Sequence, residues 1–582
     1  MGEITQAANM FRRHGLCRGD VVAILLPNLP ETHWAMWGGE TAAIAMPINP
    51  LLEPAMIATL LKAAGVKALV TLAPTPHTDI WEKVMAIVKD LPELQMVFTV
   101  SPLKYYRGLL GRALELRARI ETPKTLGVVK VFDFNKESAQ CSGDSLAFEP
   151  PGLEDIASYF CTGGTTGTPK IAMRRHETEV ANSMMIVEAL PGEMAAGTTL
   201  FCGLPIFHVN AQLVTGLIPW SQGAHVVLGS PQGYRGEGVV SRFWEIVEHH
   251  RITAFSGVPT LYAALMKTPL EGRDLSCLRF AICGAAPLPL QLLQQFELET
   301  GIAILEGYGL TEAGCASTLN PIDARRAGSV GVSLPGQRLL AMILNGDGRY
   351  LRDAADDEAG VLAVHGPNTF CGYLDPVHDR GLWIERPESD GRSLKWLNTG
   401  DIGRIDKRGF VYLTGRKKEL IIRGGHNIDP RLIEEPMHRH PAVAVAAAVG
   451  RPDAYSGEVP SLFIQLFPGA TATVDELTAF AERSIAERAA LPKHIQILPA
   501  LPTTSVGKVF KPALSMMEIE HVVRHEAALC NVVLVNLAIR QDAKKGFVAR
   551  YEALGQSAAL QEALGRYTFA VESGEAPPFV TN

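Results

Sequence analysis

Residues 157–170 read Ala-Ser-Tyr-Phe-Cys-Thr-Gly-Gly-Thr-Thr-Gly-Thr-Pro-Lys. The apolar first four residues are typical of a buried strand, and a loop rich in glycine and threonine follows from Thr162 to Lys170. Glycines let a polyphosphate approach the backbone, amide N–H groups and threonine hydroxyls donate to its oxygens, and the lysine adds positive charge. The stretch lacks the Gly-Lys-Ser/Thr ending of a Walker loop. On these residues alone, a phosphate-binding loop and a plain flexible turn are both open.

Buried strands and amphipathic helices alternate on both sides of this loop. We expect helices at 5–14, 31–38, 55–64 and 243–250, and strands at 20–26, 43–47, 66–71, 224–228, 254–256 and 278–283. Helices of this length between buried strands predict parallel sheets, and hence an α/β fold. The polar residues 136–151 are expected to form a surface excursion.

The pattern changes from about residue 328, where short strands are separated by turns such as Asn345-Gly346-Asp347-Gly348. This change predicts a β-rich subdomain at the end of a large domain that spans residues 1–417. A compact α+β unit follows at 418–515, with strands at 442–449 and 461–467 and a helix at 474–489. The tail, residues 516–582, is expected to be a small accessory unit with helices at 513–529 and 558–565 and strands at 531–539, 546–553 and 567–572.

Composition excludes several classes of protein. The chain has 582 residues and a net charge of −7, which argues against nucleic acid as the main partner. Its apolar runs fall short of the roughly 20 residues that span a bilayer. The N-terminus has no basic region followed by an apolar stretch, so it does not resemble a signal peptide. The nine cysteines are scattered without C-x-x-C spacing, which favours reduced thiols and a cytoplasmic location.

Four further segments follow the loop. They are Tyr308-Gly309-Leu310-Thr311-Glu312, Leu397-Asn398-Thr399-Gly400-Asp401, residues 415–430 (Gly-Arg-Lys-Lys-Glu-Leu-Ile-Ile-Arg-Gly-Gly-His-Asn-Ile-Asp-Pro), and Pro502-Thr503-Thr504-Ser505-Val506-Gly507-Lys508. Together with the loop, they resemble in order the signature motifs of the adenylate-forming family, which contains acyl-CoA synthetases, firefly-type luciferases and peptide-synthetase adenylation domains. The chain looks most like the bacterial fatty-acid–CoA ligases of that family. The resemblance covers about residues 1 to 515 and implies a large domain followed by a small mobile one.

The resemblance implies an ATP site. The residues expected to bind nucleotide are Thr162, Gly163, Gly164, Thr165, Thr166, Gly167, Thr168, Lys170, Gly284, Ala285, Ala286, Tyr308, Gly309, Asp401 and Arg416. Tyr308 would stack on adenine, Asp401 would accept hydrogen bonds from the ribose, and Arg416 would hold the ribose and phosphate side. Without the family match, Tyr308 would be taken as a core aromatic and Asp401 as a turn residue.

Four residues are implied to act in the first half-reaction: Lys508, Thr311, Glu312 and His208. Attack of a carboxylate on the α-phosphorus brings two anions together, and a fixed Lys508 ammonium would stabilise that transition state. Glu312, with Thr166, would bind Mg²⁺, which prefers carboxylate and phosphate oxygens. His208 follows Leu204-Pro205-Ile206-Phe207, a segment that resembles the family's acyl site, and a structural role for this histidine is equally open.

For the second half-reaction, the family rotates the small domain so that coenzyme A can enter. By position Lys418 is the hinge residue, and Gly424 and Gly425 would border the pantetheine tunnel. Small residues suit the close passage of a chain, although a plain β-turn is the competing interpretation. The expected co-substrates are therefore ATP and coenzyme A, with Mg²⁺ as the metal. A homodimer is an open possibility.

The acid is expected to be hydrophobic. The apolar residues 209–218 and the segment 256–260 are candidates to line an acyl tunnel, and no basic residue is placed to bind a second carboxylate. Two other functions stay open, an acyl-AMP ligase that loads a carrier protein and a non-catalytic nucleotide-binding homologue. Relatives usually carry a further N-terminal segment before the first helix, so either the start lies upstream or the large domain lacks its first layer.

Overall fold

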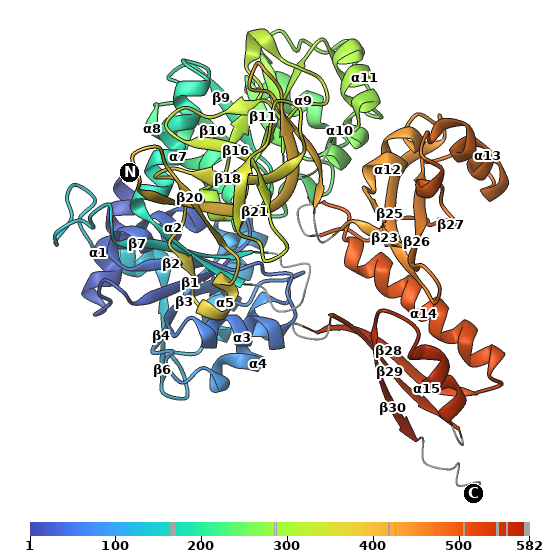
Figure 1. The fold of residues 1–582 in the computed structure, drawn as a ribbon. Helices are drawn as coiled ribbons and strands as arrows, with labels where there is room; N and C mark the ends of the chain where they lie inside the picture. The colour runs from blue at the N-terminus through green and yellow to red at the C-terminus, as the bar shows by residue number, and fades with distance from the viewer. Residues whose placement is uncertain are drawn as a thin grey trace, which may run out of the picture.

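The computed structural model describes residues 1–106, 108–162, 170–284, 286, 288–416, 419–424, 426–504, 507–542, 546–554 and 557–575. These residues form five sheets, of nine, seven, six, five and three strands. The first three sheets and their helices make one large body, and the last two follow along the chain toward the C-terminus (Figure 1). The α/β fold class expected from the sequence is therefore confirmed.

The nine-stranded sheet carries the strands on either side of the Gly/Thr loop. Its order is β19 (Gly372–Tyr373), β8 (Lys170–Arg175), β7 (Ile156–Thr162), β2 (Ile44–Pro47), β1 (Val21–Leu25), β3 (Val66–Leu72), β4 (Met96–Val100), β6 (Val129–Asp133) and β5 (Thr125–Leu126). The strands from β7 through β6 run parallel, whereas β8 turns back antiparallel to β7. Every residue of β1 is buried, as expected for a parallel strand covered on both faces.

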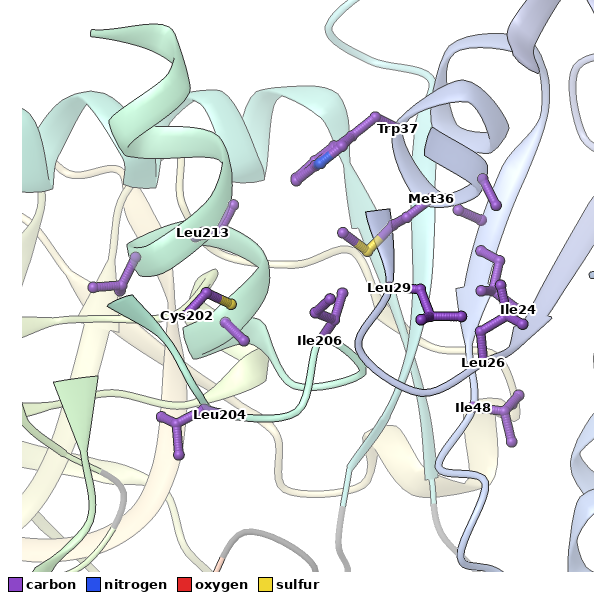
Figure 2. Close-up of a cluster of buried hydrophobic side chains, with 14 of the residues drawn as sticks. Ile24, Leu26, Leu29, Met36, Trp37, Ile48, Cys202, Leu204, Ile206 and Leu213 are labelled. Carbon is purple, nitrogen blue, oxygen red and sulfur yellow. The ribbon is translucent and has the colours of Figure 1, made fainter. Parts of the chain in front are cut away.

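The seven-stranded sheet has the order β10 (His225–Leu228), β9 (Thr199–Cys202), β11 (Ala254–Gly257), β12 (Phe280–Cys283), β13 (Ala303–Tyr308), β14 (Thr318–Leu319) and β15 (Val332–Ser333). Its first five strands are parallel. One hydrophobic core continues from this sheet into the nine-stranded sheet. Figure 2 shows part of that core, where Met36 and Trp37 face Ile206 and Leu213.

The predicted β-rich subdomain is the six-stranded antiparallel sheet. It consists of β17 (Tyr350–Asp353), β16 (Arg338–Leu344), β18 (Gly360–His365), β21 (Ser393–Ile405) and β20 (Trp383–Pro387), with β22 (Val411–Arg416) paired to β21. The turn expected at 345–348 joins β16 to β17, and residues 406–409 join β21 to β22. A core cluster packs Leu339 and Leu397 of this sheet against Tyr308 and Ala172 of the two larger sheets.

The five-stranded sheet consists of β24 (His426–Ile428), β23 (Ile421–Arg423), β26 (Gly457–Leu466), β25 (Val443–Asp453) and β27 (His494–Ile497). The three-stranded sheet is β28 (Leu534–Asp542), β29 (Gly546–Ala553) and β30 (Ala570–Glu575). A long helix, α14 (Lys511–Leu529), runs from one sheet to the other (Figure 1). The buried carboxylate of its Glu518 accepts hydrogen bonds from Arg451 and Ser461 of the five-stranded sheet. The helix therefore crosses the domain boundary predicted at residue 515.

Helices surround these sheets. In the large body they are α1 (Gly2–Arg13), α2 (Pro30–Ala42), α3 (Pro54–Ala63), α4 (Ile80–Ile87), α5 (Gly108–Glu121), α6 (Phe134–Ser138), α7 (His176–Ala189), a π-helix at Asn210–Leu217, α8 (Ile218–Ser221), α9 (Phe243–His250), α10 (Pro259–Leu265) and α11 (Leu290–Thr300). Beyond it lie α12 (Arg431–Met437), α13 (Val474–Ser484), α14 and α15 (Ala558–Leu564). Among the described residues, none of these helices is long and apolar enough to cross a membrane.

Most predicted elements agree with the structure to within a few residues, and two differ from it. The helix expected at 474–489 is α13, which ends at Ser484, because Ile485 turns into extended backbone and is buried in the core beneath. The excursion at 136–151 begins with the last turn of α6 and is held down at its centre. Asn9 of α1 donates to the carbonyls of Ser142 and Ser145 and accepts from the amide of Ala147. All nine cysteines lie in the described part of the chain and are free thiols.

Candidate active site

The Gly/Thr loop joins β7 to β8, and Thr162 and Lys170 are register partners across that hairpin. The predicted phosphate contacts Gly163, Gly164, Thr165, Thr166, Gly167 and Thr168 lie outside the described residues. The structure therefore describes the two ends of the loop, which lie side by side at one end of the sheet. This position suits a loop that closes over a polyphosphate.

Both ends of the loop meet one tyrosine that the sequence motifs did not single out. The Lys170 ammonium lies 4.7 Å from the centre of the Tyr373 ring. The Tyr373 hydroxyl donates to Glu312 Oε1 at 2.5 Å, and the Thr162 side chain also hydrogen bonds to this hydroxyl. Burial, together with the Glu312 charge, raises the pKa of Tyr373, so the hydroxyl stays a donor at neutral pH. Tyr373 thus links the loop to the carboxylate predicted to bind magnesium.

Tyr308 and Asp401 form the second part of the site. Tyr308 ends β13, is 8% exposed, and donates from its hydroxyl to Asp401 Oδ2 at 2.7 Å. Asp401 is also the cross-strand partner of Arg416, which the structure describes by its backbone alone. The residues predicted to contact adenine, ribose and phosphate are therefore neighbours, although Tyr308 and Arg416 are more than a hundred positions apart in the sequence.

Small residues border this pair. Gly284 follows β12 and Tyr308 ends the adjacent parallel strand β13, so the two lie at the same sheet edge. Open parallel sheets bind ligands at this edge, beyond the carboxyl ends of their strands. A side chain on Gly309 would lie 1.8 Å from the Cys315 carbonyl oxygen, so only glycine fits there. Thr311 begins the short turn that carries Glu312. Of the two alanines after Gly284, the structure describes Ala286, and Ala285 lies outside the described residues.

His208 lies just before the π-helix, in a segment whose backbone is clamped. Asn28 donates to the Leu204 carbonyl at 2.8 Å and accepts from the Ile206 amide at 3.0 Å. The Nε2 atom of His208 is buried and has no hydrogen-bond partner among the described residues. Burial, and secondly the nearby Lys508 charge, lower the pKa of His208 to about 3, so its ring is neutral at pH 7.

The Lys508 segment of the small unit rests on the large body. The Gly507 carbonyl accepts a hydrogen bond of 3.1 Å from the Thr260 hydroxyl at the start of α10. Gly507 has φ +83°, and an added side chain there would lie 3.0 Å from the same hydroxyl oxygen. Lys508 is held in turn through its amide, which donates to Thr504 Oγ1 at 3.2 Å. Lys508 also lies close enough to His208 for its charge to act on the histidine ring.

Of the residues predicted for coenzyme A and the hinge, the structure describes Gly424, which lies apart from the Lys508 site. Gly424 lies in the turn between β23 and β24, where its amide donates to the Ser456 carbonyl at 2.6 Å. Gly425 and the hinge residue Lys418 lie outside the described residues. The described part of the turn is therefore tied to the five-stranded sheet and not to the Lys508 site.

A buried polar cluster lies beneath the site. Arg174 of β8 donates to Gln212 of the π-helix at 2.8 Å, and Gln212 donates to Glu40 and Glu179 at 3.0 and 3.1 Å. Ser158 of β7 donates to Glu179 at 2.5 Å. The cluster therefore connects both arms of the Gly/Thr hairpin with the helix that follows His208. Burial, then the Glu179 charge, raises the pKa of Glu40 well above its ordinary value.

Two neighbours of the site, Tyr373 and Asn28, were missed at the sequence level, and Thr260 was named only within the segment 256–260 as a candidate to line an acyl tunnel. Thr260 meets a partner 247 positions away, and Asn28 meets one 176 positions away. Local sequence patterns do not predict contacts between residues so far apart in the chain. Tyr373 lies in the two-residue strand β19, which pairs with β8. This pairing brings Tyr373 to the site, and it can be recognised once the order of the sheet is known.

Comparison with known proteins identifies the family. The family model described as AMP-binding enzyme matches residues 2–374, and the model for the C-terminal domain of these enzymes matches residues 432–508. This chain belongs to the AMP-binding enzyme family. The match to the C-terminal model ends at Lys508, the last residue of the predicted terminal motif.

The relatives of this family member include several acid–CoA ligases. A marinolic acid–CoA ligase of Pseudoalteromonas sp. is 38% identical, over 87% of this chain and 73% of the relative. A long-chain-fatty-acid–CoA ligase of Bacillus subtilis is 32% identical, over 88% of both chains. Relatives at 30% identity include a sulfoacetate–CoA ligase and a feruloyl-CoA synthase. The crystal structure of ATP-bound MatB from Rhodopseudomonas palustris superposes with a TM-score of 0.74 at 26% identity, covering 89% of this chain and 92% of that one.

Proposed function

We propose that this member of the AMP-binding enzyme family activates a hydrophobic carboxylic acid with ATP and passes the acyl group to coenzyme A. AMP-forming ligation of an acid to coenzyme A, through an acyl adenylate, is the activity of the family members to which it is most similar. The observation that supports the proposal is the hydrogen bond from Thr260 to the Gly507 carbonyl, next to Lys508. It is supported further by the proximity of Lys508 to His208, whose Nε2 has no hydrogen-bond partner in the part of the chain that the structure describes.

In the first half-reaction, a carboxylate oxygen of the acid attacks the α-phosphorus of ATP. An oxygen–phosphorus bond forms, the bond to the β-phosphate oxygen breaks, and pyrophosphate leaves with the electron pair. Negative charge builds up between the two reactants, and the Lys508 ammonium stabilises it more strongly in the transition state than in the separated reactants. His208 is neutral, so it orients the carboxylate by hydrogen bonding from Nε2 without adding charge.

The nucleotide would occupy the edge formed by β12, β13 and the Gly/Thr hairpin. Asp401 holds the ribose hydroxyls and is itself fixed by Tyr308, whose ring borders the adenine. Arg416 acts from the neighbouring strand on the ribose and phosphate side. Lys170 and Thr162 hold the two ends of the phosphate loop, with Gly163, Gly164, Thr165, Thr166, Gly167 and Thr168 between them, while Thr311 contacts the phosphates.

Magnesium fits this site as a partner of the substrate. In the part of the chain that the structure describes, no three His, Cys, Asp or Glu side chains come together to form a metal cage. Magnesium commonly binds one or two carboxylates together with substrate phosphates, and Glu312 supplies one carboxylate whose other contact is the Tyr373 hydroxyl. Glu312, with Thr166, would hold the ion, which supplies charge neutralisation to the phosphates. The residues of the chain hold and orient the reactants around it.

In the second half-reaction, the coenzyme A thiolate attacks the acyl carbonyl carbon and AMP leaves. The carbon–sulfur bond forms, the carbon–oxygen bond to phosphate breaks, and the thiol proton passes to solvent. Lys508 must withdraw for the thiol to enter, so we propose that the small unit turns about Lys418 and brings Gly424 and Gly425 to the pantetheine path. The release of the docking contact from Thr260 to Gly507 is one requirement of that turn.

The preference for a hydrophobic acid rests on the surroundings of His208. The segment from Leu204 to Leu213 packs on Met36 and Trp37 of α2 through apolar side chains (Figure 2). A hydrophobic acyl chain buries well in such surroundings, whereas a second carboxylate would need a cation there. Since the relatives include ligases named for acids as unlike as sulfoacetate and marinolic acid, the family alone leaves the acid open.

The test is a panel of acids of graded chain length, incubated with the purified chain, ATP, Mg²⁺ and coenzyme A, with AMP and thioester both measured. We expect equal amounts of AMP and thioester, with the highest kcat/KM for hydrophobic acids. AMP without thioester would favour a ligase that loads a carrier protein, and a lack of AMP with every acid would favour a non-catalytic homologue. A preference for short charged acids would contradict the proposed substrate class.

A further inference from the structure

Helix α5 presents its large apolar side chains to solvent. Leu109, Leu110, Leu116 and Ile120 are 84%, 73%, 60% and 75% exposed. The residues buried on the opposite side are small, namely Gly111 and Ala118. An ordinary surface helix has the reverse arrangement, with leucines against the protein and polar residues outside. The apolar outer face of α5 is therefore unfavourable in water and becomes favourable when another surface covers it.

The exposed residues form one stripe. Leu109, Leu116 and Ile120 are seven and four positions apart, a spacing that brings them to the same side of a helix. At 100° per residue, Arg112 and Arg119 follow one edge of this stripe and Arg117 follows the other. An apolar stripe flanked by arginines is typical of a helix that lies in the plane of a membrane surface.

Charge separates this segment from the rest of the chain. Residues 104–124 hold six basic and two acidic side chains, whereas the whole chain carries a net charge of −7. Both acids are paired within the helix, Glu121 with Arg117 at 2.6 Å and Glu115 with Arg119 at 2.8 Å. The surface around the leucines is therefore positive, which complements the phosphates of an anionic lipid surface.

A second copy of the chain fits this stripe less well. A symmetric contact would place the arginine edges of one α5 against those of the other, and like charges would then face each other at the rim. A bilayer offers the apolar layer for the leucines and the phosphate layer for the arginines at the same time. Charge complementarity thus favours lipid as the occupant.

The helix is anchored to the part of the large body that carries the acyl segment. The Tyr105 hydroxyl, at the start of the segment, donates to both carboxylate oxygens of Glu31 at 3.2 Å. The Lys104 ammonium pairs with the same carboxylate and lies 5.5 Å from the centre of the Trp34 ring. Glu31 and Trp34 belong to α2, the helix whose Met36 and Trp37 pack against the segment before His208 (Figure 2).

We propose that α5 is a membrane-surface helix, in which Leu109, Leu116 and Ile120 enter the boundary between headgroups and acyl chains of an anionic phospholipid bilayer. Arg112 and Arg119 bind the lipid phosphates. Hydrophobic acids concentrate in bilayers, so this contact would hold the enzyme where such a substrate is found. The contact itself does not depend on which acid is activated.

The test is co-sedimentation of the full chain with vesicles of phosphatidylglycerol mixed with phosphatidylcholine. The wild-type chain should bind them, and the triple variant Leu109→Gln, Leu116→Gln, Ile120→Gln should lower the partition coefficient at least about tenfold, since each side chain loses its apolar burial. Glutamine preserves helix propensity. The matched control is Leu298→Gln, which changes a leucine that is 85% exposed on α11 and should leave vesicle binding unchanged.

Charge is tested separately with Arg112→Gln and Arg119→Gln, which should weaken binding to phosphatidylglycerol vesicles and reduce its dependence on salt. AMP formation with a water-soluble acid in vesicle-free buffer should be the same in all variants, so a failure of the membrane proposal is distinct from a failure of the proposed activity. Absence of wild-type binding, equal binding by the triple variant, or a dimer by sedimentation that the triple variant dissociates would each overturn the proposal.

Discussion

We propose that His208 and Lys508 act on the same carboxylate, and burial, followed by the nearby Lys508 charge, determines the charge state of the histidine. Burial and the neighbouring ammonium lower the pKa of His208 to about 3 from an ordinary value near 6.5. A base with a lowered pKa stays neutral over the whole range above that value. Between pH 5 and pH 8, therefore, His208 neither gains nor loses a proton in the docked arrangement.

This charge state makes a prediction about pH. The rate of adenylate formation at saturating substrate should show no step near pH 6.5 that belongs to His208, and His208→Asn should lower the rate at every pH by a similar factor. The measurement is pyrophosphate exchange into ATP from pH 5 to pH 8 for both proteins. A step near pH 6.5 in the wild type that disappears in the variant would show that the ring titrates, against this account.

At the same scale, the candidate site was predictable where a short motif carries its own chemistry. Thr162, Lys170, Glu312 and Lys508 were named from local segments, and the structure brings the first three to Tyr373. Their roles stay predictions. Tyr373 and Thr260 could not be found in this way, because what distinguishes them is a partner brought close by folding, and a single tyrosine or threonine carries no such mark.

At the scale of elements, the buried cluster around Arg174 holds the Gly/Thr hairpin against α2, α7 and the π-helix. Arg174 is fully buried and lies 3.5 Å from Glu179, whose oxygens also accept from Ser158 and Gln212. One arginine thus faces two carboxyl groups, and burial together with the Glu179 charge favours the neutral form of Glu40. The remaining ion pair is compensated, and removal of its cation would leave a charge buried and unpaired.

Arg174→Met should therefore destabilise the large body by about 3–5 kcal/mol, since it strands the Glu179 carboxylate. Glu40→Gln should change stability by less than about 1 kcal/mol at pH 5, because the amide replaces a carboxyl group whose neutral form the raised pKa favours. The raised pKa of Glu40 contributes stability below the unfolded value of 4.5 and loses it as the pH rises. The stability of Glu40→Gln relative to that of the wild type should consequently rise as the pH increases.

The measurement is the midpoint of the first thermal transition for the two variants and the wild type, taken at pH 5 and at pH 8. A midpoint for Glu40→Gln that falls relative to the wild type between these pH values would contradict a protonated Glu40. An Arg174→Met midpoint equal to that of the wild type would show that Glu179 finds another partner.

Elements were the most predictable level of this structure. The strands β1, β2 and β3 and the helices α2 and α3 agree with the expected ranges to within a few residues. The three strands are almost continuous buried runs, and α3 buries one face through Ile57, Leu60 and Leu61. The end of α13 was placed wrongly, since the helical pattern continues past Ser484 while the chain turns to bury Ile485. Local periodicity does not predict where burial in the core ends a helix, because that burial depends on residues distant in the sequence.

At the scale of the whole molecule, the arrangement of the two units was not predictable from sequence. The docking contact between Thr260 and the Gly507 carbonyl joins α10 to the terminal motif, and the motif itself indicates only that a lysine is needed somewhere near ATP. Likewise, α14 belongs to both C-terminal sheets, so a division of the chain at residue 515 cuts a helix whose Glu518 is bonded to the five-stranded sheet.

The docking contact should matter for one half-reaction only. Thr260→Val keeps the shape of the side chain and removes the donor, which costs about 1 kcal/mol and should slow adenylate formation roughly fivefold. Thioester formation from supplied acyl adenylate should be unchanged, since the small unit has then left this position. Thr260→Ser retains the hydroxyl and serves as the control. Equal slowing of both half-reactions by Thr260→Val would mean that the residue acts on folding or acyl binding instead.

We propose that the docked small unit delivers Lys508 to the α-phosphate of ATP. The Lys508→Ala variant tests this role when it is measured in the two half-reactions on one preparation, with Lys407→Ala in the exposed turn at 406–409 as control. Pyrophosphate exchange into ATP should fall about a hundredfold to a thousandfold, while thioester formation from supplied acyl adenylate and coenzyme A stays at the parent rate. Exchange at the parent rate in Lys508→Ala would contradict the account.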